Sequence, residues 1–251
     1  MPDRAHLRPD LEARLGLRVV EHGRIDSTMA AARADGGPAP AVHLAESQSA
    51  GRGRFGRSWA SPPGNLYATI RWPDPRSDVP PGLLGAIQIA WAAALRAAGG
   101  PDARCKWPND CWLGGGKWSG VIALRPAARP GEIHVGLGAN LIVAPPGVSD
   151  PPATALARHW PGRPGADAMS ELLLAAAVGV LRDGPGGVRS RLAGWSRYDA
   201  LALGEGIVVE SGGRLRQGTY RGVDADGRLR LEEESGEVRL SSGEVARLRA
   251  S

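Results

Sequence analysis

The stretch that most constrains this chain is the run from Glu46 to Trp59, which is rich in glycine, alanine and arginine. Glycine lets the backbone approach a ligand closely and adopt positive φ, at an entropic cost of about 0.5–1 kcal/mol per site. Arginine adds a permanent charge and a forked set of donors that matches a carboxylate or a phosphate. Because the arginines repel one another when nothing neutralises them, the composition predicts a loop that closes as a lid over an anionic ligand.

The sequence on either side of this run decides between three interpretations. Gly-Arg repeats also occur in disordered RNA-binding segments, and charged runs are often only solvated surface. An apolar run over residues 41–45 precedes the stretch, and residues 65–70 alternate with period two, so the loop joins two predicted strands. Disordered tails are not built into a sheet, so this setting favours an anion-binding loop.

Length and composition set the class of the protein. A chain of 251 residues, 42% hydrophobic and 23% charged, can bury one substantial core and a small second domain. The net charge of +5 favours anionic ligands mildly but is too small to indicate nucleic acid. The two cysteines, Cys105 and Cys111, form no disulfide framework or zinc site and predict a reducing, cytoplasmic location. No stretch has the apolar length of a signal peptide or membrane span, so we expect no membrane partner.

Hydrophobic periodicity predicts strands and helices in the first part of the chain. The expected strands cover residues 18–22, 41–45, 65–71 and 132–143, with a further one opened by Lys117. The expected helices begin after Ser27 and Thr28, cover residues 84–95, run from a cap at Asp167 to residue 181, and cover residues 188–198. Ser27 and Thr28 are interpreted as caps that can also hold a polar ligand. The stretch before Leu17 is predicted to be a frayed lead-in, too short for a helix-turn-helix domain.

From about residue 203 the pattern changes to short strands separated by glycine-containing turns. The predicted strands cover residues 207–210, 214–223, 228–232 and 238–241. This change predicts two domains, a catalytic domain over residues 1–202 and a small antiparallel barrel over residues 203–251.

A second informative segment runs from Lys106 to Gly120. Pro108 interrupts strand pairing, while Asn109 and Asp110 can turn the chain through side-chain hydrogen bonds to its backbone. A triple glycine then forms a hairpin into the strand opened by Lys117, which brings two lysines and one aspartate to one end of the sheet. Taken alone, the segment could equally be only a well-made turn.

In their order and spacing, these motifs resemble the biotin protein ligases, which attach biotin to a lysine of the carboxyl-carrier domain of acetyl-CoA carboxylase and related enzymes. The resemblance extends from about residue 20 to the end of the chain. It is carried by Ser27-Thr28, Gln48, Gly51-Arg52-Gly53-Arg54-x-Gly56-Arg57-x-Trp59, Asn65-Leu66-Tyr67, Lys106-Trp107-Pro108-Asn109-Asp110, Lys117-x-x-Gly120 and Gly136-x-Gly138-x-Asn140. Either glycine-containing loop alone would be a weak signal, but together they are specific.

The resemblance implies a fold, a reaction and partners. The fold is α+β, a mixed-sheet catalytic domain of the biotin/lipoate ligase type followed by an SH3-like β-barrel. Biotin and Mg-ATP would give biotinoyl-5′-AMP and pyrophosphate, and the carrier lysine would then attack the mixed anhydride without an enzyme nucleophile. The partner is the carrier domain, dimerisation through the catalytic sheet occurs in the family, and the missing N-terminal DNA-binding domain implies a monofunctional ligase that binds no DNA.

The resemblance also assigns roles, which agree with the need to bring two anions together and hold developing charge. The catalytic residues are Lys117, Arg52 and Asp110, and Asp110 is also the candidate for Mg²⁺ or for the incoming lysine. The biotin-binding residues are Ser27, Thr28, Gln48, Gly51, Arg52, Gly53, Arg54, Lys117 and Gly120. The residues for ATP and the adenylate are Arg52, Arg54, Arg57, Trp59, Lys106, Asn109 and Asn140.

Three positions depart from the family pattern, and two alternatives remain. Met29, Trp118 and Leu124 replace residues that are commonly polar, aliphatic and acidic, respectively. A lipoate or octanoate ligase on the same fold is the first alternative, although an aliphatic acyl chain would give Ser27, Thr28 and Gln48 no partners. A nucleic-acid-binding module is the second, and it gives no reason for Lys117.

Overall fold

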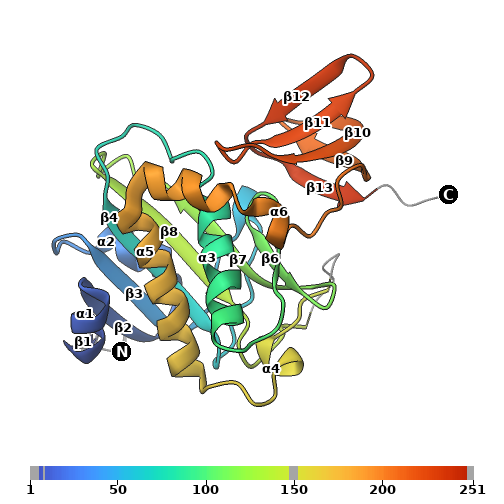
Figure 1. Ribbon diagram of the computed structural model, residues 1–251. Helices are drawn as coiled ribbons and strands as arrows, with labels where there is room; N and C mark the ends of the chain where they lie inside the picture. The colour runs from blue at the N-terminus through green and yellow to red at the C-terminus, as the bar shows by residue number, and fades with distance from the viewer. Residues whose placement is uncertain (1–5, 8, 147–151, 248–251) are drawn as a thin grey trace.

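The computed structural model describes residues 6–7, 9–146 and 152–247, which form two separate β-sheets (Figure 1). The large sheet has eight strands in the order β1-β2-β3-β4-β8-β7-β6-β5, and the small one has five in the order β12-β11-β10-β9-β13. The large sheet consists of β1 (His6–Leu7), β2 (Arg18–Ile25), β3 (Ala41–Gln48), β4 (Leu66–Pro73), β8 (Glu132–Ala139), β7 (Gly116–Leu124), β6 (Asp110–Leu113) and β5 (Arg104–Lys106). The small sheet consists of β12 (Gly236–Leu240), β11 (Leu229–Glu233), β10 (Arg214–Val223), β9 (Gly206–Ser211) and β13 (Glu244–Arg247).

The large sheet is mixed, which confirms the predicted fold class. β2 and β3 pair in parallel through the crossover helix α2 (Thr28–Ala34), and every other pair of neighbouring strands in this sheet is antiparallel. The small sheet is antiparallel throughout. This arrangement places the first turn of α2 beside the ends of β3 and β4, where the predicted lid begins.

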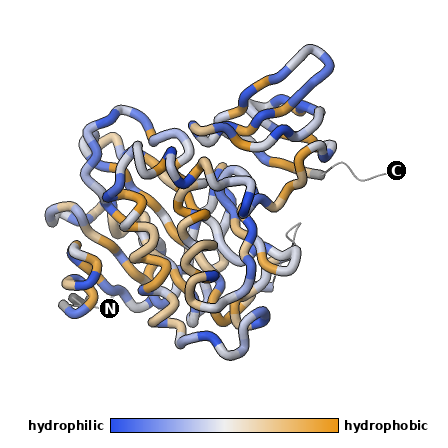
Figure 2. The backbone as a smooth tube through the Cα atoms, in the orientation of Figure 1, coloured by the Kyte–Doolittle hydropathy of each residue, from blue (hydrophilic) through white to orange (hydrophobic). Residues whose placement is uncertain are grey.

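Two long helices cover one face of the large sheet, α3 (Leu83–Ala97) and α5 (Ala166–Leu192) (Figure 1). Hydrophobic residues are concentrated along these helices and the central strands (Figure 2). Trp91 is completely buried between them, as predicted, and its indole donates a hydrogen bond of 2.8 Å to the carbonyl of Leu173. The main core therefore lies between this helical layer and the sheet, leaving the opposite face and the strand ends for a binding site.

Several elements differ from their predicted form. The N-cap residue of α5 is Gly165, and Asp167 lies inside the first turn, where a carboxylate still favours the positive end of the helix dipole. The backbone leaves the helical conformation only at Gly184, and Pro185 starts the helix again because it needs no N–H partner there. The chain then continues to a short helix, α6 (Trp195–Tyr198), so the predicted second helix over residues 188–198 is divided between the end of α5 and α6.

The two ends of the described chain are more regular than predicted. The lead-in contains a helix, α1 (Pro9–Leu15), whose buried Leu11 and Leu15 join the main core. The C-terminal sheet has a fifth strand, β13, which pairs with β9.

A short helix, α4 (Leu156–His159), follows the segment that lies outside the described residues. No helix among the described residues has the length and apolarity needed to cross a membrane.

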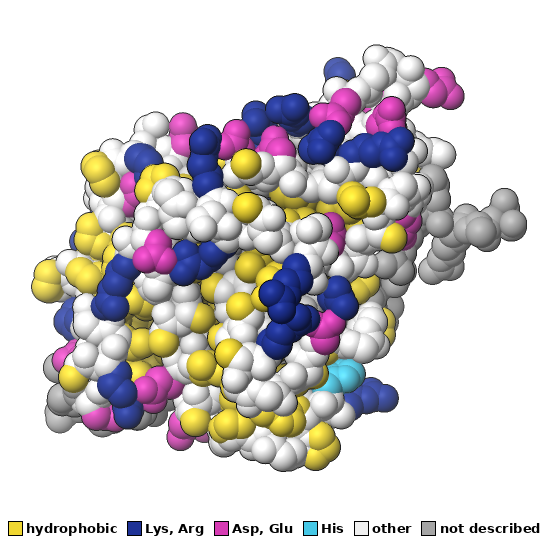
Figure 3. Space-filling view, in the orientation of Figure 1, with side chains coloured by type: hydrophobic (Ala, Val, Ile, Leu, Met, Phe, Trp, Pro, Cys, Tyr) yellow, Lys and Arg dark blue, Asp and Glu magenta, His cyan; other side chains and the backbone are white. Residues whose placement is uncertain are grey.

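The outer surface of the C-terminal sheet carries basic and acidic side chains that alternate (Figure 3). Cross-strand ion pairs join Arg216 to Glu233, Arg221 to Glu232 and Arg230 to Glu237. Exposed pairs of this kind contribute about 0–1 kcal/mol each, so they describe a solvated surface. A nucleic-acid-binding sheet would instead present a largely basic face, and this sheet does not.

A buried polar cluster lies below the C-terminal end of α2. Arg71 is completely buried on β4 and donates hydrogen bonds to Glu132 at 2.8 and 3.0 Å and to Asp35 at 2.5 Å. His43 lies 3.2 Å from the same Asp35 carboxylate and 3.1 Å from the ring of His22. The carboxylates of Asp35 and Glu132 thereby compensate the positive charge of Arg71, as a buried ion requires.

This cluster predicts a loss of stability in acid. Burial lowers the pKa of His43 to about 4, although Asp35 favours the charged ring. The unfolded chain therefore binds a proton at this position first as the pH falls below about 6.5, so the free energy of unfolding decreases between about pH 6.5 and 4. We expect His43 to account for about 2 kcal/mol of the decrease from pH 7 to pH 5.

Urea unfolding of the wild-type chain and of His43→Gln, at both pH values, measures this contribution. Glutamine cannot titrate, so the difference in stability between pH 7 and pH 5 should be smaller in the variant. An unchanged difference would mean that other histidines and carboxylates, and not His43, cause the loss of stability in acid.

Candidate active site

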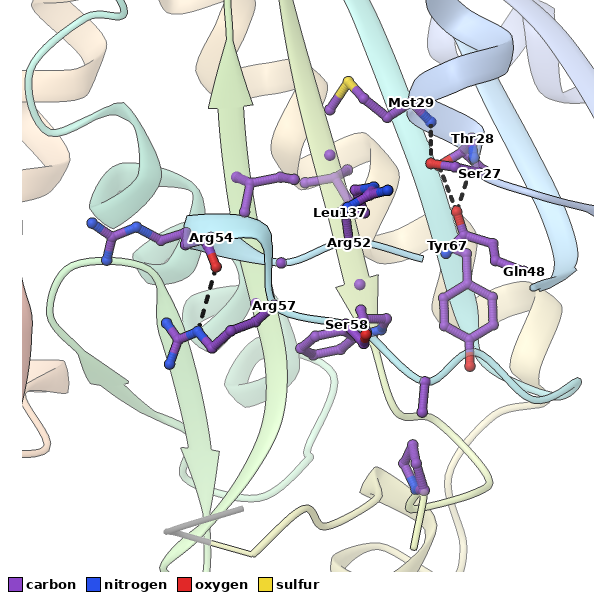
Figure 4. Close-up of a pocket in the computed structure, with 18 of the residues that line it drawn as sticks. Ser27, Thr28, Met29, Gln48, Arg52, Arg54, Arg57, Ser58, Tyr67 and Leu137 are labelled. Carbon is purple, nitrogen blue, oxygen red and sulfur yellow. Dashed lines mark hydrogen bonds between the residues drawn. The ribbon is translucent and has the colours of Figure 1, made fainter. Parts of the chain in front are cut away.

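A cavity of about 320 Å³ opens at the end of the large sheet, on the face that carries α2 (Figure 4). Residues from α2, β3, β4, β7, β8 and the Glu46–Trp59 run line it. Twelve of the predicted site residues are among them: Ser27, Thr28, Gln48, Arg52, Gly53, Arg54, Arg57, Trp59, Asn109, Lys117, Gly120 and Asn140. Segments more than 100 residues apart in the chain therefore meet at one place.

The polar wall of the cavity is formed by Ser27, Thr28 and Gln48. Ser27 caps α2, and its hydroxyl accepts a hydrogen bond of 3.2 Å from the backbone N–H of Met29. The amide oxygen of Gln48 accepts from the backbone N–H of Thr28 at 2.8 Å and from its hydroxyl at 3.2 Å. The Gln48 amide nitrogen donates to the Ser61 hydroxyl at 2.9 Å. This network holds the amide and hydroxyl groups of the polar wall in fixed positions before any ligand binds (Figure 4).

The arginine-rich loop, residues 51–59, folds back on itself beside the polar wall. The N–H of Trp59 donates to the carbonyl of Gly51 at 2.9 Å, and that of Gly53 donates to the carbonyl of Arg57 at 2.7 Å. A Cβ on Gly51 would lie 2.4 Å from the Trp59 carbonyl oxygen, so only glycine fits there. At the tip, Phe55 is 69% exposed and adopts a φ of 54°, a left-handed conformation that is uncommon for a residue with a side chain.

The three arginines of this loop differ in their partners. Arg54 donates to Asn109 at 3.3 Å and to the carbonyl of Gly243 at 3.0 Å, and Arg57 forms an ion pair with Glu244. Burial lowers the pKa of Arg54, while the nearby Asp110 carboxylate opposes this effect. In the part of the chain that the structure describes, the Arg52 side chain has no ion-pair partner. The loop is therefore attached to the C-terminal sheet at two arginines, and the third remains available for an anion.

Lys117 lies at the centre of the charged side of the cavity. Its Nζ is 2.8 Å from Oδ1 of Asp110, an ion pair without the alignment of a hydrogen bond, and 5.2 Å from the centre of the Trp59 ring. A Cβ on Gly138 would lie 2.8 Å from the Trp59 indole, and one on Gly120 would lie 3.4 Å from it. The two glycines thus make room for this indole, which in turn lies beneath the lysine.

Three predicted site residues do not line the cavity. Gly51 shapes the loop backbone, and Asp110 reaches the site through its contact with Lys117. Lys106 pairs with Asp110 across β5 and β6, but its ammonium group lies 4.8 Å from the centre of the Trp112 ring. Its role at the nucleotide stays a prediction.

Asn109 and Asn140 hold the far rim of the cavity. The Asn109 amide nitrogen donates to the carbonyl of Val121 at 3.1 Å, and that of Asn140 donates to the carbonyl of Thr154 at 3.1 Å. Oδ1 of Asn140 is buried and has no hydrogen-bond partner among the described residues.

Several other lining residues carry weaker signals in the sequence. The cavity is also lined by Tyr67, Thr69, Gly136 and Leu137. Met29, which departs from the family pattern, lies beside the polar wall. The period-two pattern of β4 places Tyr67 and Thr69 on one face, which is the signal that identifies them. Burial raises the pKa of Tyr67 to about 12, so its hydroxyl remains a neutral donor, here to the carbonyl of Pro62.

The residues of the site fit a magnesium ion that is held mainly by a nucleotide. Among the described residues no three His, Cys, Asp or Glu side chains gather in a way that could hold a metal. Mg²⁺ commonly uses one or two carboxylates together with substrate phosphates and water, and Asp110 offers one carboxylate beside the charged side of the cavity. The prediction of Asp110 as the magnesium ligand is compatible with this geometry.

Comparison with known proteins places the chain in a family. Residues 23–140 match the biotin/lipoate A/B protein ligase family, and residues 202–248 match the biotin protein ligase C-terminal domain. The biotin–[acetyl-CoA-carboxylase] ligase of Paracoccus denitrificans is 35% identical over 88% of this chain and 97% of that protein. The ligase of the same name from Mycobacterium tuberculosis is 32% identical over 99% of this chain and 100% of that protein.

Solved structures agree on the fold. The biotin protein ligase of Aquifex aeolicus in complex with biotin and ATP is 22% identical, with a TM-score of 0.79 over 92% of this chain and 99% of that one. A Helicobacter pylori biotin acetyl coenzyme A carboxylase synthetase with bound biotinylated ATP gives a TM-score of 0.57 at 19% identity, over 87% and 99% of the two chains. From the sequence matches and this common fold, the chain belongs to the biotin protein ligases of the biotin/lipoate A/B protein ligase family.

Proposed function

We propose that this chain is an ATP-dependent ligase that activates biotin as biotinoyl-5′-AMP and transfers it to a lysine of a biotin carboxyl carrier domain of acetyl-CoA carboxylase or a related carboxylase. The observation that supports this most is that Lys117 lines the same cavity as the polar wall and the arginine-rich loop. A single cation there can contact both a carboxylate and a phosphate.

The polar wall is the proposed site for the ureido ring of biotin. A ureido group has two N–H donors and a carbonyl acceptor, and Ser27, Thr28 and Gln48 together supply hydroxyl and amide partners. These partners are already fixed by their own hydrogen bonds. A ligand with an aliphatic chain at this position would leave such groups unpaired, which is the strongest basis for rejecting a wrong substrate.

Lys117 is proposed to hold the biotin carboxylate against the α-phosphate of ATP. The carboxylate oxygen attacks the α-phosphorus, the bond to the pyrophosphate oxygen breaks, and negative charge moves to the departing pyrophosphate. Lys117 offsets the repulsion between the two anions, and Arg52 approaches the new phosphate ester from the loop. Asp110 keeps the lysine oriented toward the cavity before the ligands arrive.

Asp110 is proposed to hold Mg²⁺ together with the ATP phosphates. When bound, the ion neutralises phosphate charge. The carboxylate of Asp110, which contacts Lys117, would supply a protein oxygen to the ion.

In the second step the carrier lysine replaces the nucleotide. Its neutral amine attacks the acyl carbon of the mixed anhydride, an amide bond forms, AMP departs and the amine loses a proton. The arginine-rich loop keeps the adenylate from water until the carrier lysine enters. No residue of this chain needs to form a covalent bond with the substrate.

The test of this function is a reconstituted reaction. The purified chain is incubated with MgATP, biotin and a purified carrier domain, and intact-mass measurement follows the carrier while chromatography follows AMP. We expect one biotinoyl group per carrier, in proportion to the AMP formed. If lipoate or octanoate modifies the lysine of a lipoyl domain and biotin gives no product, the chain is a lipoate or octanoate ligase.

Arg52→Ala is expected to release the adenylate from the site. Removing one charge-assisted contact weakens binding of the intermediate by about tenfold, so more of it escapes into solution before transfer. The escape is measured as biotinoylation of lysines on a bystander protein. The ligase itself offers few amines to react, because Lys106 and Lys117 are its only lysines.

The control is Arg214→Ala, which removes an exposed arginine from β10 in the C-terminal sheet. It should leave the escape unchanged. If Arg52→Ala also leaves it unchanged, Arg52 has no part in retaining the adenylate.

Three further expectations stay predictions. A division of the chain at residues 202 and 203 is compatible with a C-terminal sheet that begins at Gly206. A cytoplasmic location still depends on the cysteine content. Homodimerisation through the large sheet depends on the resemblance to the family alone.

A further inference from the structure

We infer that Trp107 is a positioning residue, through which the C-terminal sheet fixes the Lys106–Asp110 turn beside the active site. This inference depends on the proposed function and adds a residue to it. Trp107 is 3% exposed, and its indole N–H donates a hydrogen bond of 2.9 Å to the carbonyl of Gly227, 120 residues further along the chain. Gly227 lies in the turn between β10 and β11 of the other sheet.

The acceptor is held in a rigid turn. The carboxylate of Asp224 accepts hydrogen bonds of 2.9 Å from the backbone N–H groups of Asp226 and Arg228. The N–H of Gly227 donates to the carbonyl of Asp224 at 2.9 Å. The direction of the Gly227 carbonyl is therefore determined by the turn and does not depend on Trp107.

The same turn is pressed against the beginning of α3 in the large domain. Gly227 has a φ of 78°, and a Cβ at this position would lie only 2.2 Å from Cα of Gly82. A Cβ on Gly82 would in turn lie 3.1 Å from the carbonyl oxygen of Asp226. The two backbones are in contact, so the turn cannot move closer to the large domain.

The turn that carries the donor, Trp107, is itself held by β7. Asn109, two residues after Trp107, is joined to β7 by two hydrogen bonds with Val121, at 2.9 Å between the backbones and 3.1 Å from its side chain. Asp110 follows directly and contacts Lys117. The turn thus lies between β7 and the C-terminal sheet, and releasing Trp107 removes its direct hydrogen bond to that sheet.

The indole N–H of Trp107 donates a hydrogen bond, as do those of the buried Trp91 and Trp195, whereas three other indoles among the described residues do not. Within the described ranges, the indole nitrogens of Trp59, Trp112 and Trp118 are buried and have no hydrogen-bond partner. The chain therefore tolerates an unpaired indole elsewhere. At Trp107 the indole N–H instead joins two domains directly behind Asn109 and Asp110.

The test compares Trp107→Phe with Trp112→Phe. Both variants keep an aromatic ring and lose an indole N–H, but only the first loses a hydrogen bond. We expect Trp107→Phe to slow biotinoyl-adenylate formation about tenfold and to raise the Mg²⁺ concentration needed for half the maximal rate. Its affinity for biotin alone should stay within about twofold, because the hydrogen bonds that hold the polar wall are made among α2, β3, β4 and Ser61 and do not involve the turn. Trp112→Phe should resemble the wild type in both measurements.

A second pair of variants tests the acceptor. Gly227→Ala and Gly213→Ala each place a Cβ at a φ near +75°, at 78° and 74°, but only Gly227 has backbone atoms within 4 Å of that Cβ. We expect Gly227→Ala to slow adenylate formation more than Gly213→Ala. The double variant with Trp107→Phe should be slowed by less than the product of the two single effects, because both act on one contact.

Each outcome decides the inference. If Trp107→Phe equals Trp112→Phe while the wild type makes adenylate, Trp107 does not position the turn. If biotin affinity falls in parallel with the rate, the role is general stabilisation of the fold and the inference is wrong. A wild-type chain that makes no biotinoyl-adenylate at all overturns the proposed function, which is a separate result.

Discussion

Lys117→Ala is expected to lower the rate of biotinoyl-adenylate formation by at least a hundredfold while leaving the fold intact. The lysine is proposed to contact two anions, and each charge-assisted contact contributes about 1.5–3 kcal/mol. Losing both contacts amounts to about 3–6 kcal/mol, which corresponds to roughly 150- to 25,000-fold in rate. The measurement is formation of labelled adenylate from biotin and ATP in a single turnover.

Two controls separate this effect from misfolding. The melting temperature of Lys117→Ala should stay close to that of the wild type, because the ammonium group is partly exposed, at 27% of its side chain, and holds no part of the core. Arg214→Ala removes a cation from the other sheet and should leave adenylate formation unchanged. Near-normal adenylate formation by a folded Lys117→Ala variant contradicts the role assigned to this residue.

Asp110→Asn is expected to reduce adenylate formation by about 10- to 100-fold. The change removes the proposed magnesium ligand and the ion pair with Lys117, while the side chain keeps its shape. The measurement is the adenylation rate over a range of Mg²⁺ concentrations. Part of the lost rate should return at high Mg²⁺, because a weaker site is filled by mass action.

The magnesium dependence identifies what Asp110 does. A lower rate with an unchanged half-saturating Mg²⁺ concentration would mean that Asp110 acts only by orienting Lys117. A normal rate at every Mg²⁺ concentration would remove Asp110 from the site altogether.

Much of this site could be predicted because its parts are local. Asp110 and Lys117 meet because a short hairpin with glycines at its turn joins β6 to β7, and turn chemistry of this kind is evident from the sequence. Ser27 caps α2 because a hydroxyl residue precedes an alanine-rich run. The order of the motifs then placed these local pieces within one family.

What could not be predicted depends on contacts between distant segments. Arg54 contacts the carbonyl of Gly243, 189 residues later, and no periodicity encodes such a pairing. The ammonium group of Lys106 lies 4.8 Å from the centre of the Trp112 ring, a contact that its motif does not specify, and its role at the nucleotide stays a prediction. The helix α1 was missed because charges and prolines mask the two leucines that it buries.

The central claim is that the polar wall selects biotin, and isothermal titration tests it most directly. The purified chain is titrated with biotin and separately with lipoate, with and without a non-hydrolysable ATP analogue. We expect biotin to give a heat of binding and lipoate to give none. Binding of lipoate or octanoate with no response to biotin would contradict the substrate and the roles of Ser27, Thr28 and Gln48, while leaving the fold unchanged.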